Sequence, residues 1–332
     1  MALSKKQGVA IGVAAAAVLA IAGVVTAVTL NRPTEAAADY ATPAPKETSA
    51  NVSADDIEWV TGEVVPEAVA ALKESGFEPI EKGKLTVAVG AFVPPLSYVP
   101  DGETLPAGTE PNIGSLIAEG LGLEYNPVVV AWADWPLGVQ SGKYDLITSN
   151  VTVTEERKEL FDFASYRQDL LGFYVKADST IDKIEEAADI SGLKIVVGSG
   201  TNQEQVLLKW NEELEADGKA PAELQYYDDN AAATLALQSG RVDASFGPNA
   251  TAAWAARETG DTRLVGIVPG GWPLAATIAA GTAKGNGLIE PVGIVLNELI
   301  ANGKYAEVLK AWGLDSEGID ASEINPQGLP KS

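Results

Sequence analysis

Short apolar runs alternate with helical stretches from residue 84 onward, and this alternation restricts the possible folds more than any other feature of the chain. The first series predicts elements in the order strand 85–90, helix 113–122, strand 126–132 and strand 144–153. A second series begins near residue 189 with a strand, a tight glycine turn and a helix, followed by a strand and a helix over 223–240. Two such series predict an α/β protein with two lobes and a cleft where their strands end.

The composition excludes several classes of function. With 332 residues and 46% hydrophobic content, the chain can bury a full core and form more than one compact unit. A formal net charge of -23 disfavours nucleic acid and anionic membrane surfaces as partners. The chain has no Cys and no His, which removes thiolate nucleophiles, the usual zinc sites and any Ser-His-Asp arrangement. We therefore expect no metal site and no cofactor.

The first 30 residues predict export of the rest of the chain. Lys5 and Lys6 precede an uncharged apolar run over 8–30, which is long enough to cross a bilayer as a helix. A cleaved signal usually has an apolar core of roughly 7 to 15 residues, so this length favours an uncleaved membrane anchor. The alternative is cleavage after the three alanines at 36–38, which would release a secreted protein. Residues 31–54, rich in Pro, Ala, Thr and Ser, are typical of a flexible linker.

Several stretches between residues 84 and 314 resemble family 3 solute-binding proteins of the polar amino acid uptake type, the extracytoplasmic partners of ABC transporters. The matching stretches are KLTVAVGAFVPPLSY, QSGKYDLI followed by TEERKELFDF, VVGSGTNQE, LQSGRVDA and the terminal NGKYAEVLKAWGL. Their number, order and spacing carry the resemblance. It implies an α/β fold of the periplasmic-binding-protein type II class, in which two lobes each contain a mainly parallel sheet flanked by helices.

The resemblance also implies how the chain divides and what it meets. Lobe 1 is expected over 84–172 and 275–314, lobe 2 over 173–274, and a C-terminal tail over 315–332. Two hinge crossings are expected near 173–176 and 269–274, so that solute binding and lobe closure are one event. The implied partners are a small-molecule solute and an ABC permease with its cytoplasmic ATPase, and the implied state is a monomer, held at the membrane if residues 1–30 are uncleaved.

The stretch SNVTVTEERKE carries the residues that the resemblance assigns to the ligand in lobe 1. Arg157 occupies the position that grips the ligand carboxylate, and a planar guanidinium is the best bidentate donor to such a group. Ser149, Asn150 and Thr152 match small polar positions at the ligand's other end. The alternative is an ordinary helix start, with Thr154 as its cap and Arg157 in a surface ion pair.

In lobe 2, the stretch GSGTNQE predicts a strand-to-helix turn whose helix N-terminus directs unpaired N–H groups at an anion. The resemblance implies that Thr201 contacts the same carboxylate as Arg157, with Asn202 and Gln203 beside it. These residues can also cap the following helix, and both roles can hold at once. Phe92 and Trp132 fall near ligand-lining positions of lobe 1, where an aromatic face covers an apolar chain or attracts a cation; core packing is the alternative.

One position departs from the family pattern. The family places an Asp after the GRVDA stretch, where it pairs with the ligand's α-ammonium, and this chain has Pro248 there with Asn249 next. A neutral amide is a weaker partner for a desolvated ammonium than a carboxylate. The solute is therefore expected to lack a free α-amino group or to carry its cation elsewhere. Asp134 and Asp169 are the possible amine partners, with solvated surface acids as the alternative.

Two other functions are compatible with the same scaffold. Cyclohexadienyl dehydratases use this cleft for a dehydration, which needs a carboxyl group with a raised pKa facing the cleft. The position best suited to that acid is Pro248, which counts against an enzyme. An accessory sensor would instead present its closed state to a membrane partner. We expect a binding protein without catalytic residues.

Overall fold

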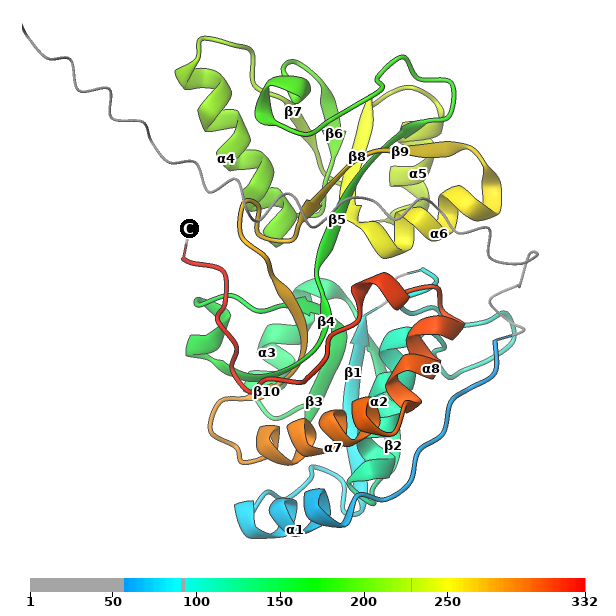
Figure 1. The fold of residues 1–332 in the computed structure, drawn as a ribbon, viewed down its shortest axis with the longest axis vertical. Helices are drawn as coiled ribbons and strands as arrows, with labels where there is room; N and C mark the ends of the chain where they lie inside the picture. Colours follow the sequence, from blue (N-terminus) through cyan, green and yellow to red (C-terminus); the bar gives the residue numbers. More distant parts are fainter. Residues whose placement is uncertain (1–56, 91–92, 228, 332) are drawn as a thin grey trace, which may run out of the picture. The chain divides into compact units, whose positions relative to one another are not determined.

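A computed structural model describes residues 57–90, 93–227 and 229–331, which form two five-stranded sheets flanked by helices (Figure 1). The strand orders are β2-β1-β3-β10-β4 and β7-β6-β8-β5-β9. The predicted two-lobed α/β architecture is therefore confirmed. The segments predicted as anchor and linker, 1–30 and 31–54, lie outside the described residues. Within the described part of the chain, every helix is too short or too polar to cross a membrane.

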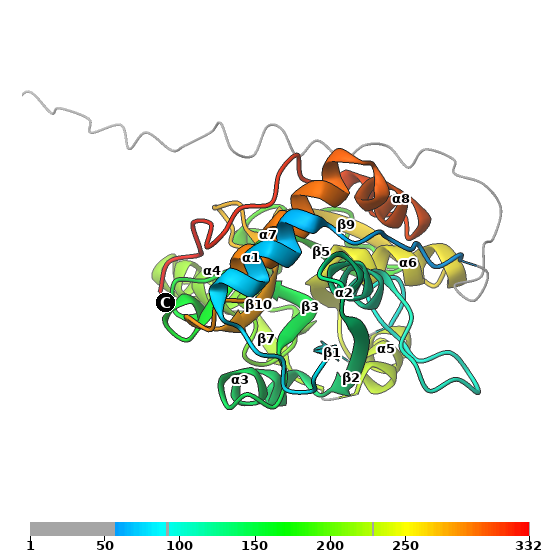
Figure 2. The same ribbon diagram turned by 90° about the horizontal axis from the view of Figure 1, so that it is seen from below.

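Lobe 1 is built on the first sheet. Its strands are β1 (Lys84–Gly90), β2 (Glu124–Val130), β3 (Leu146–Thr152), β4 (Phe161–Gln168) and β10 (Thr277–Ala283). Its helices are α1 (Pro66–Ser75), α2 (Thr109–Gly120), α3 (Trp135–Gln140), α7 (Ile289–Ala301) and α8 (Lys304–Ala311), with 3-10 turns η2 (Trp132–Asp134), η3 (Arg157–Glu159) and η5 (Asp315–Glu317). Helices α2, α7 and α8 pack in one apolar cluster, and α3 packs in another on the opposite face (Figure 2).

Lobe 2 is built on the second sheet. Its strands are β5 (Leu170–Lys176), β6 (Lys194–Val196), β7 (Glu223–Gln225), β8 (Ala244–Pro248) and β9 (Thr262–Pro269). Its helices are α4 (Asn202–Ala216), α5 (Asn230–Gln238) and α6 (Asn249–Thr259), with the 3-10 turn η4 (Ala187–Ile190). Alternate residues of a strand face opposite sides, and accordingly Ile195 joins the cluster with α4 whereas Val196 joins the cluster with α5.

Both sheets are mixed, which corrects the prediction of mainly parallel sheets. Strand β1 pairs in parallel with β2 and β3, as β6 does with β7 and β8, but the remaining pairs are antiparallel. The antiparallel pairs arise because the chain crosses between the lobes twice in opposite directions, outward through β4 and β5 and back through β9 and β10. Apolar periodicity identifies a strand but not its direction, so the sequence did not reveal this arrangement.

The first crossing lies at Asp169, a few residues before the predicted one. Strand β5 of lobe 2 already begins at Leu170, so residues 170–172 belong to lobe 2 and not to lobe 1. The second crossing spans 270–276, between β9 and β10, and overlaps the predicted range. The two crossings are hydrogen-bonded to each other, because Asp169 accepts the N–H of Gly270 at 2.8 Å and donates its own to Ala276 at 2.9 Å.

The two similar stretches SGKYD and SGRVD have the same structural role in the two lobes. Each follows a helix that ends before a left-handed glycine, Gly142 or Gly240. The aspartate of each stretch then accepts a backbone N–H from a strand of its own sheet: Asp145 from Thr86 of β1 at 2.8 Å and Asp243 from Lys194 of β6 at 2.8 Å. These acids fix the turn against the sheet, which explains why the same residues recur in both lobes.

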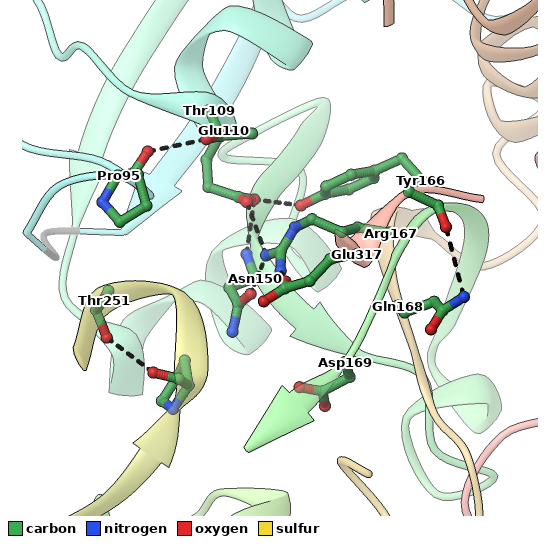
Figure 3. A network of polar contacts seen from close by, with 12 residues as sticks. Pro95, Thr109, Glu110, Asn150, Tyr166, Arg167, Gln168, Asp169, Thr251 and Glu317 are labelled. Carbon is green, nitrogen blue, oxygen red and sulfur yellow. Dashed lines mark hydrogen bonds and ion pairs between the residues drawn. The ribbon is translucent and has the colours of Figure 1, made fainter. Parts of the chain in front are cut away.

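A buried ion cluster ties the segment predicted as a C-terminal tail to the core of lobe 1. Arg167 of β4 lies between the carboxylates of Glu110 and Glu317 (Figure 3), and each of the three is at most 2% exposed. Tyr166 donates its hydroxyl to Glu110, and the backbone N–H of Asn150 donates to the same carboxylate at 2.8 Å. Glu317 is therefore part of the lobe's packed interior.

Arg167→Met retains much of the side-chain volume but leaves Glu110 and Glu317 as buried carboxylates without their cation. Breaking a buried ion pair by removing one partner costs about 3 to 5 kcal/mol, and we expect a loss of unfolding free energy of that order. Urea unfolding followed by tryptophan fluorescence measures it, with Arg241→Met at an exposed arginine as the matched control. Equal urea midpoints for the two variants would contradict the proposed role of Arg167.

Candidate ligand-binding site

Polar side chains from both lobes meet beside the first crossing. Thr152, at the end of β3, has its hydroxyl oxygen 2.7 Å from Asp169 Oδ2 and 3.0 Å from Asn202 Oδ1. Asn202, the first residue of α4, donates from Nδ2 to the same Asp169 oxygen at 2.9 Å and to the carbonyl oxygen of Gly270 at 2.6 Å. Three of the residues predicted from sequence thus belong to one hydrogen-bonded group that joins lobe 1, lobe 2 and both crossings.

Asp169 is the centre of this group. It is 3% exposed, and burial raises the pKa of its carboxyl group, while the hydrogen bonds from Thr152 and Asn202 and the charges of Arg167 and Arg157 act in the opposite direction. Position 270 requires a glycine, since a Cβ atom there would lie 2.2 Å from the Asp169 carboxylate. The sequence pattern did not indicate that a glycine is needed at position 270, because Asp169, which it approaches, lies far from it along the chain.

Arg157 lies in the η3 turn and faces two indole rings. Its Nη1 donates to the carbonyl oxygen of Thr152 at 2.7 Å, and its guanidinium carbon is 5.5 Å from the ring centroid of Trp132 and 5.8 Å from that of Trp135. These distances fit cation–π interactions. Burial lowers the pKa of Arg157 to about 10, opposed by the charges of Asp169 and Glu156, so the side chain remains a cation at neutral pH.

The alternative interpretation of this turn is correct in one respect. Thr154 Oγ1 accepts the backbone N–H of Arg157 at 3.0 Å and so caps the turn. The guanidinium, however, is directed at Thr152 and the indoles, and no salt bridge to Arg157 occurs within the described residues. Its positive charge is held in place by a carbonyl oxygen and aromatic faces and is available to an anion.

The N-terminus of α4 is capped as expected. Thr201 is the N-cap: its hydroxyl oxygen accepts the N–H of Glu204 at 3.3 Å and donates to the carbonyl oxygen of Gly198 at 2.6 Å. Gly200 donates its N–H to the Glu204 carboxylate at 2.7 Å. Gln203 is buried. The capping role of Thr201 is therefore present, and contact of Thr201 and Gln203 with a carboxylate stays a prediction.

Ser149 and Asn150 are hydrogen-bonded inside lobe 1. Ser149 Oγ accepts the N–H of Gly90 at 2.8 Å. Asn150 has a left-handed backbone with φ of 51°, and its side-chain oxygen accepts a hydrogen bond from Arg167. The buried ion cluster thus holds the backbone of β3 two residues before Thr152. A direct contact of Ser149 or Asn150 with a ligand stays a prediction.

The remaining predicted residues are dispersed. Trp132 lies beside Arg157, while Phe92 is outside the described residues. Asn249 begins α6, and its side-chain oxygen accepts the hydroxyl of Tyr174 at 2.9 Å. Asp134 is exposed in η2. Of the two possible amine partners, Asp169 is the one that the fold brings to Thr152, Asn202 and Arg157.

Two residues that contact predicted site residues were not themselves predicted to belong to the site. Trp135 is buried and also faces the guanidinium of Arg157. Its spacing of three residues from Trp132 places both indoles on one side of a helical turn, and this signal could have identified the pair. Tyr174, the partner of Asn249, carried no comparable signal because it lies in a strand of buried residues.

The chain is similar in sequence and in fold to known proteins. The sequence model of the bacterial extracellular solute-binding proteins, family 3, matches residues 85–315. The arginine-binding protein ArgT of Corynebacterium glutamicum is 28% identical over 279 residues, which cover 83% of this chain and 88% of that protein. The structure of an ancestral arginine-binding protein bound to arginine has a TM-score of 0.61 at 26% identity and covers 70% of this chain and 98% of that chain.

A further structure shares the fold alone. The ancestral amino acid-binding protein AncCDT-1, a precursor of cyclohexadienyl dehydratase, has a TM-score of 0.59 at 23% identity and covers 74% of this chain and 98% of that chain. Together these structures show that the two mixed sheets form the two-lobed type II fold of periplasmic amino acid-binding proteins.

Asp169→Asn should make stability less dependent on pH. Since burial raises the pKa of Asp169 in the folded protein, both states are protonated at low pH, and a cost of ionising the folded state develops as the pH rises. An amide cannot ionise, so the unfolding free energy of the variant relative to the parent should increase as the pH rises above about 4, where the unfolded carboxyl group ionises. Urea unfolding at each pH measures this, with Asp217→Asn at an exposed position as the control for loss of one acid. A difference for Asp169→Asn that does not grow with pH would count against a buried, ionised carboxylate.

Proposed function

The chain belongs to the bacterial extracellular solute-binding proteins of family 3, and on that premise we propose that it binds an amino acid or an amino-acid-like small carboxylate between its two lobes and delivers it to an ABC permease. One observation carries the proposal. An available cation, Arg157, lies near a buried carboxylate, Asp169, among polar side chains of both lobes. A cation beside an anion suits a solute that carries both charges.

Arg157 receives the carboxylate of the solute. Its guanidinium is oriented by the carbonyl oxygen of Thr152 and by the two indoles, which reduces the entropy lost when a ligand binds. The N-terminus of α4, which begins at Asn202, adds a positive dipole end. Thr201 and Gln203 complete the carboxylate subsite, and Ser149 and Asn150 serve the other end of the solute.

The amino group of the solute pairs with Asp169 and not with residue 248. Pro248 has no charge, and the side-chain oxygen of Asn249 already accepts a hydrogen bond from Tyr174. Asp169 is negative and surrounded by side chains of both lobes, and Trp132 offers an aromatic face for a displaced cation. This arrangement favours a solute whose cation lies away from the usual α position.

The protein acts as an extracytoplasmic monomer whose closed form is recognised by the permease and its cytoplasmic ATPase. Contacts from both lobes to one solute stabilise the closed state, so binding and closure are coupled. Residues 1–30 either anchor the protein or direct its secretion. A thermal-shift screen against amino acids, opines, amines and small carboxylates tests the proposal, because a ligand selective for the folded state raises its melting temperature. No shift with any of these compounds would oppose it.

One observation favours a dehydratase as the second candidate. Burial raises the pKa of Asp169, and a carboxyl group with a raised pKa is what a proton donor in this site needs. Incubation with a cyclohexadienyl carboxylate and detection of an aromatic product by ultraviolet absorbance separates enzyme from binding protein. Permease and ATPase genes beside this gene would favour transport over both the enzyme and an accessory sensor.

Arg157→Ala should weaken binding of the best ligand from the screen by about 2 to 5 kcal/mol, because truncating one partner of a buried charge pair has that effect. Folding should be nearly unchanged, since within the described residues the guanidinium donates its hydrogen bond to the carbonyl oxygen of Thr152. Isothermal titration calorimetry measures the loss, with Arg241→Ala as the matched control at an exposed arginine. An Arg157→Ala protein that binds as tightly as the parent would rule out the proposed anchor.

Pro248→Asp should improve binding of a simple L-α-amino acid, because it returns a carboxylate to the position where the family holds the α-ammonium. The backbone suits the change: Pro248 has φ of -53° and is the N-cap of α6, a position that aspartate favours. Pro248→Asn is the matched control, since it caps the helix without adding charge. Submicromolar binding of an unmodified L-amino acid by the parent, with its ammonium on Asn249, would instead restore the conventional ligand class.

A further inference from the structure

The chain continues beyond the family match at residue 315 and returns along lobe 1. We name residues 322–331 the C-terminal strap; they run beside β4, the edge strand of the first sheet, and are drawn in red in Figure 1. Ile324 forms a bridge with Ala164, and Asn325 exchanges hydrogen bonds with the backbone of Phe163, donating its N–H at 2.8 Å and accepting at Oδ1 at 3.0 Å. The strap thus covers an edge that would otherwise be open to pairing.

The end of the strap holds the loop that carries Arg157. Leu329 donates its N–H to the carbonyl oxygen of Val153 at 3.0 Å and accepts the N–H of Glu155 at 2.8 Å. The Glu155 carboxylate in turn accepts the N–H of Gly328 at 2.8 Å. Lys331 pairs with Glu159, and Lys158 donates to the carbonyl oxygen of Pro326 at 3.0 Å. The loop is therefore attached to the strap on both sides of Arg157.

Leu329 also contacts the second crossing. A Cβ atom added at Gly271 would lie 1.8 Å from Leu329 Cδ2, so the leucine side chain lies directly against this glycine. Gly271 belongs to the crossing that carries Gly270, whose carbonyl oxygen accepts from Asn202. The side chain of Leu329 thus touches the second crossing, while its backbone is bonded to the Arg157 loop.

We infer that Leu329 is a positioning residue, which holds the Arg157 loop and the second crossing in fixed relation and thereby sets the affinity of the site without contacting the solute. The effect on affinity rests on the proposed function. The effect on the loop and the crossing does not, because it follows from the contacts of Leu329 alone.

A double-mutant cycle in the full chain tests the inference. Leu329→Ala should speed hydrogen exchange of the amides in 153–160 and 270–276 roughly tenfold, because it removes packing that holds both segments. Gly271→Ala should do the same by clashing with Leu329. The double variant should exchange more slowly than the two single effects predict, since the new methyl group occupies space that the leucine vacates.

Ile324→Ala is the matched control, because Ile324 is a half-buried aliphatic residue of the same strap that packs against Gly293 of α7. It should leave exchange in 153–160 at the parental rate. Equal acceleration by Leu329→Ala and Ile324→Ala, or strictly additive effects of Leu329→Ala and Gly271→Ala, would overturn the inference. If Leu329→Ala does not fold, hydrogen exchange in Gly271→Ala tests the inference instead. Amides in 153–160 that exchange at the parental rate in that variant would overturn it.

Titration with L-arginine as the probe separates this inference from the proposed function. Weaker binding by Leu329→Ala than by Ile324→Ala is the expected result, and equal affinities would overturn the link from strap to site. Absence of L-arginine binding by the parent would agree with a solute that lacks the usual α-ammonium, and the exchange measurements would then decide the role of Leu329.

Discussion

The buried carboxylate of Asp169 lies where both crossings between the lobes meet, and the site depends on it. Its side chain accepts from Thr152 of lobe 1 and Asn202 of lobe 2, and its backbone is bonded to Gly270 and Ala276 of the other crossing. A buried anion is costly unless it is paired and hydrogen-bonded, so these donors and the nearby Arg157 and Arg167 must stay close. We expect any movement of one lobe against the other to centre on this residue.

Two arginines near Asp169 have different roles because their surroundings differ. Arg167 is fully buried between Glu110 and Glu317, so its charge is already compensated and serves to fix β4, β3 and the segment after α8. Arg157 is half-buried, and its contacts are a carbonyl oxygen and two indole rings. A bound carboxylate would compensate this second charge, whereas it would have no access to the first. Residue type alone therefore does not distinguish an arginine whose charge is already compensated from one whose charge is open to a ligand.

Much of the site could be predicted because its residues stand in recognisable local patterns. Thr152 and Arg157 follow a strand in one stretch, and Thr201 and Asn202 begin a helix after a glycine turn, so their neighbourhood follows from where strands and helices end. The choice between Asp134 and Asp169 could not be made in this way, because both are isolated acids near the ends of apolar runs. The mixed sheets and the position of the first crossing also escaped prediction, since strand direction depends on the path of the chain between distant segments.

Composition and periodicity alone determined the α/β class, the two lobes and the exclusion of thiol, histidine and usual zinc chemistry, because these follow from which residue types are present and how often apolar ones recur. Only the tertiary structure decided that Asp169 lies among the site residues, that Trp135 faces Arg157, and that Leu329 returns to the Arg157 loop. These contacts join segments whose spatial relation comes from packing and chain path, and no local pattern of residues encodes that relation.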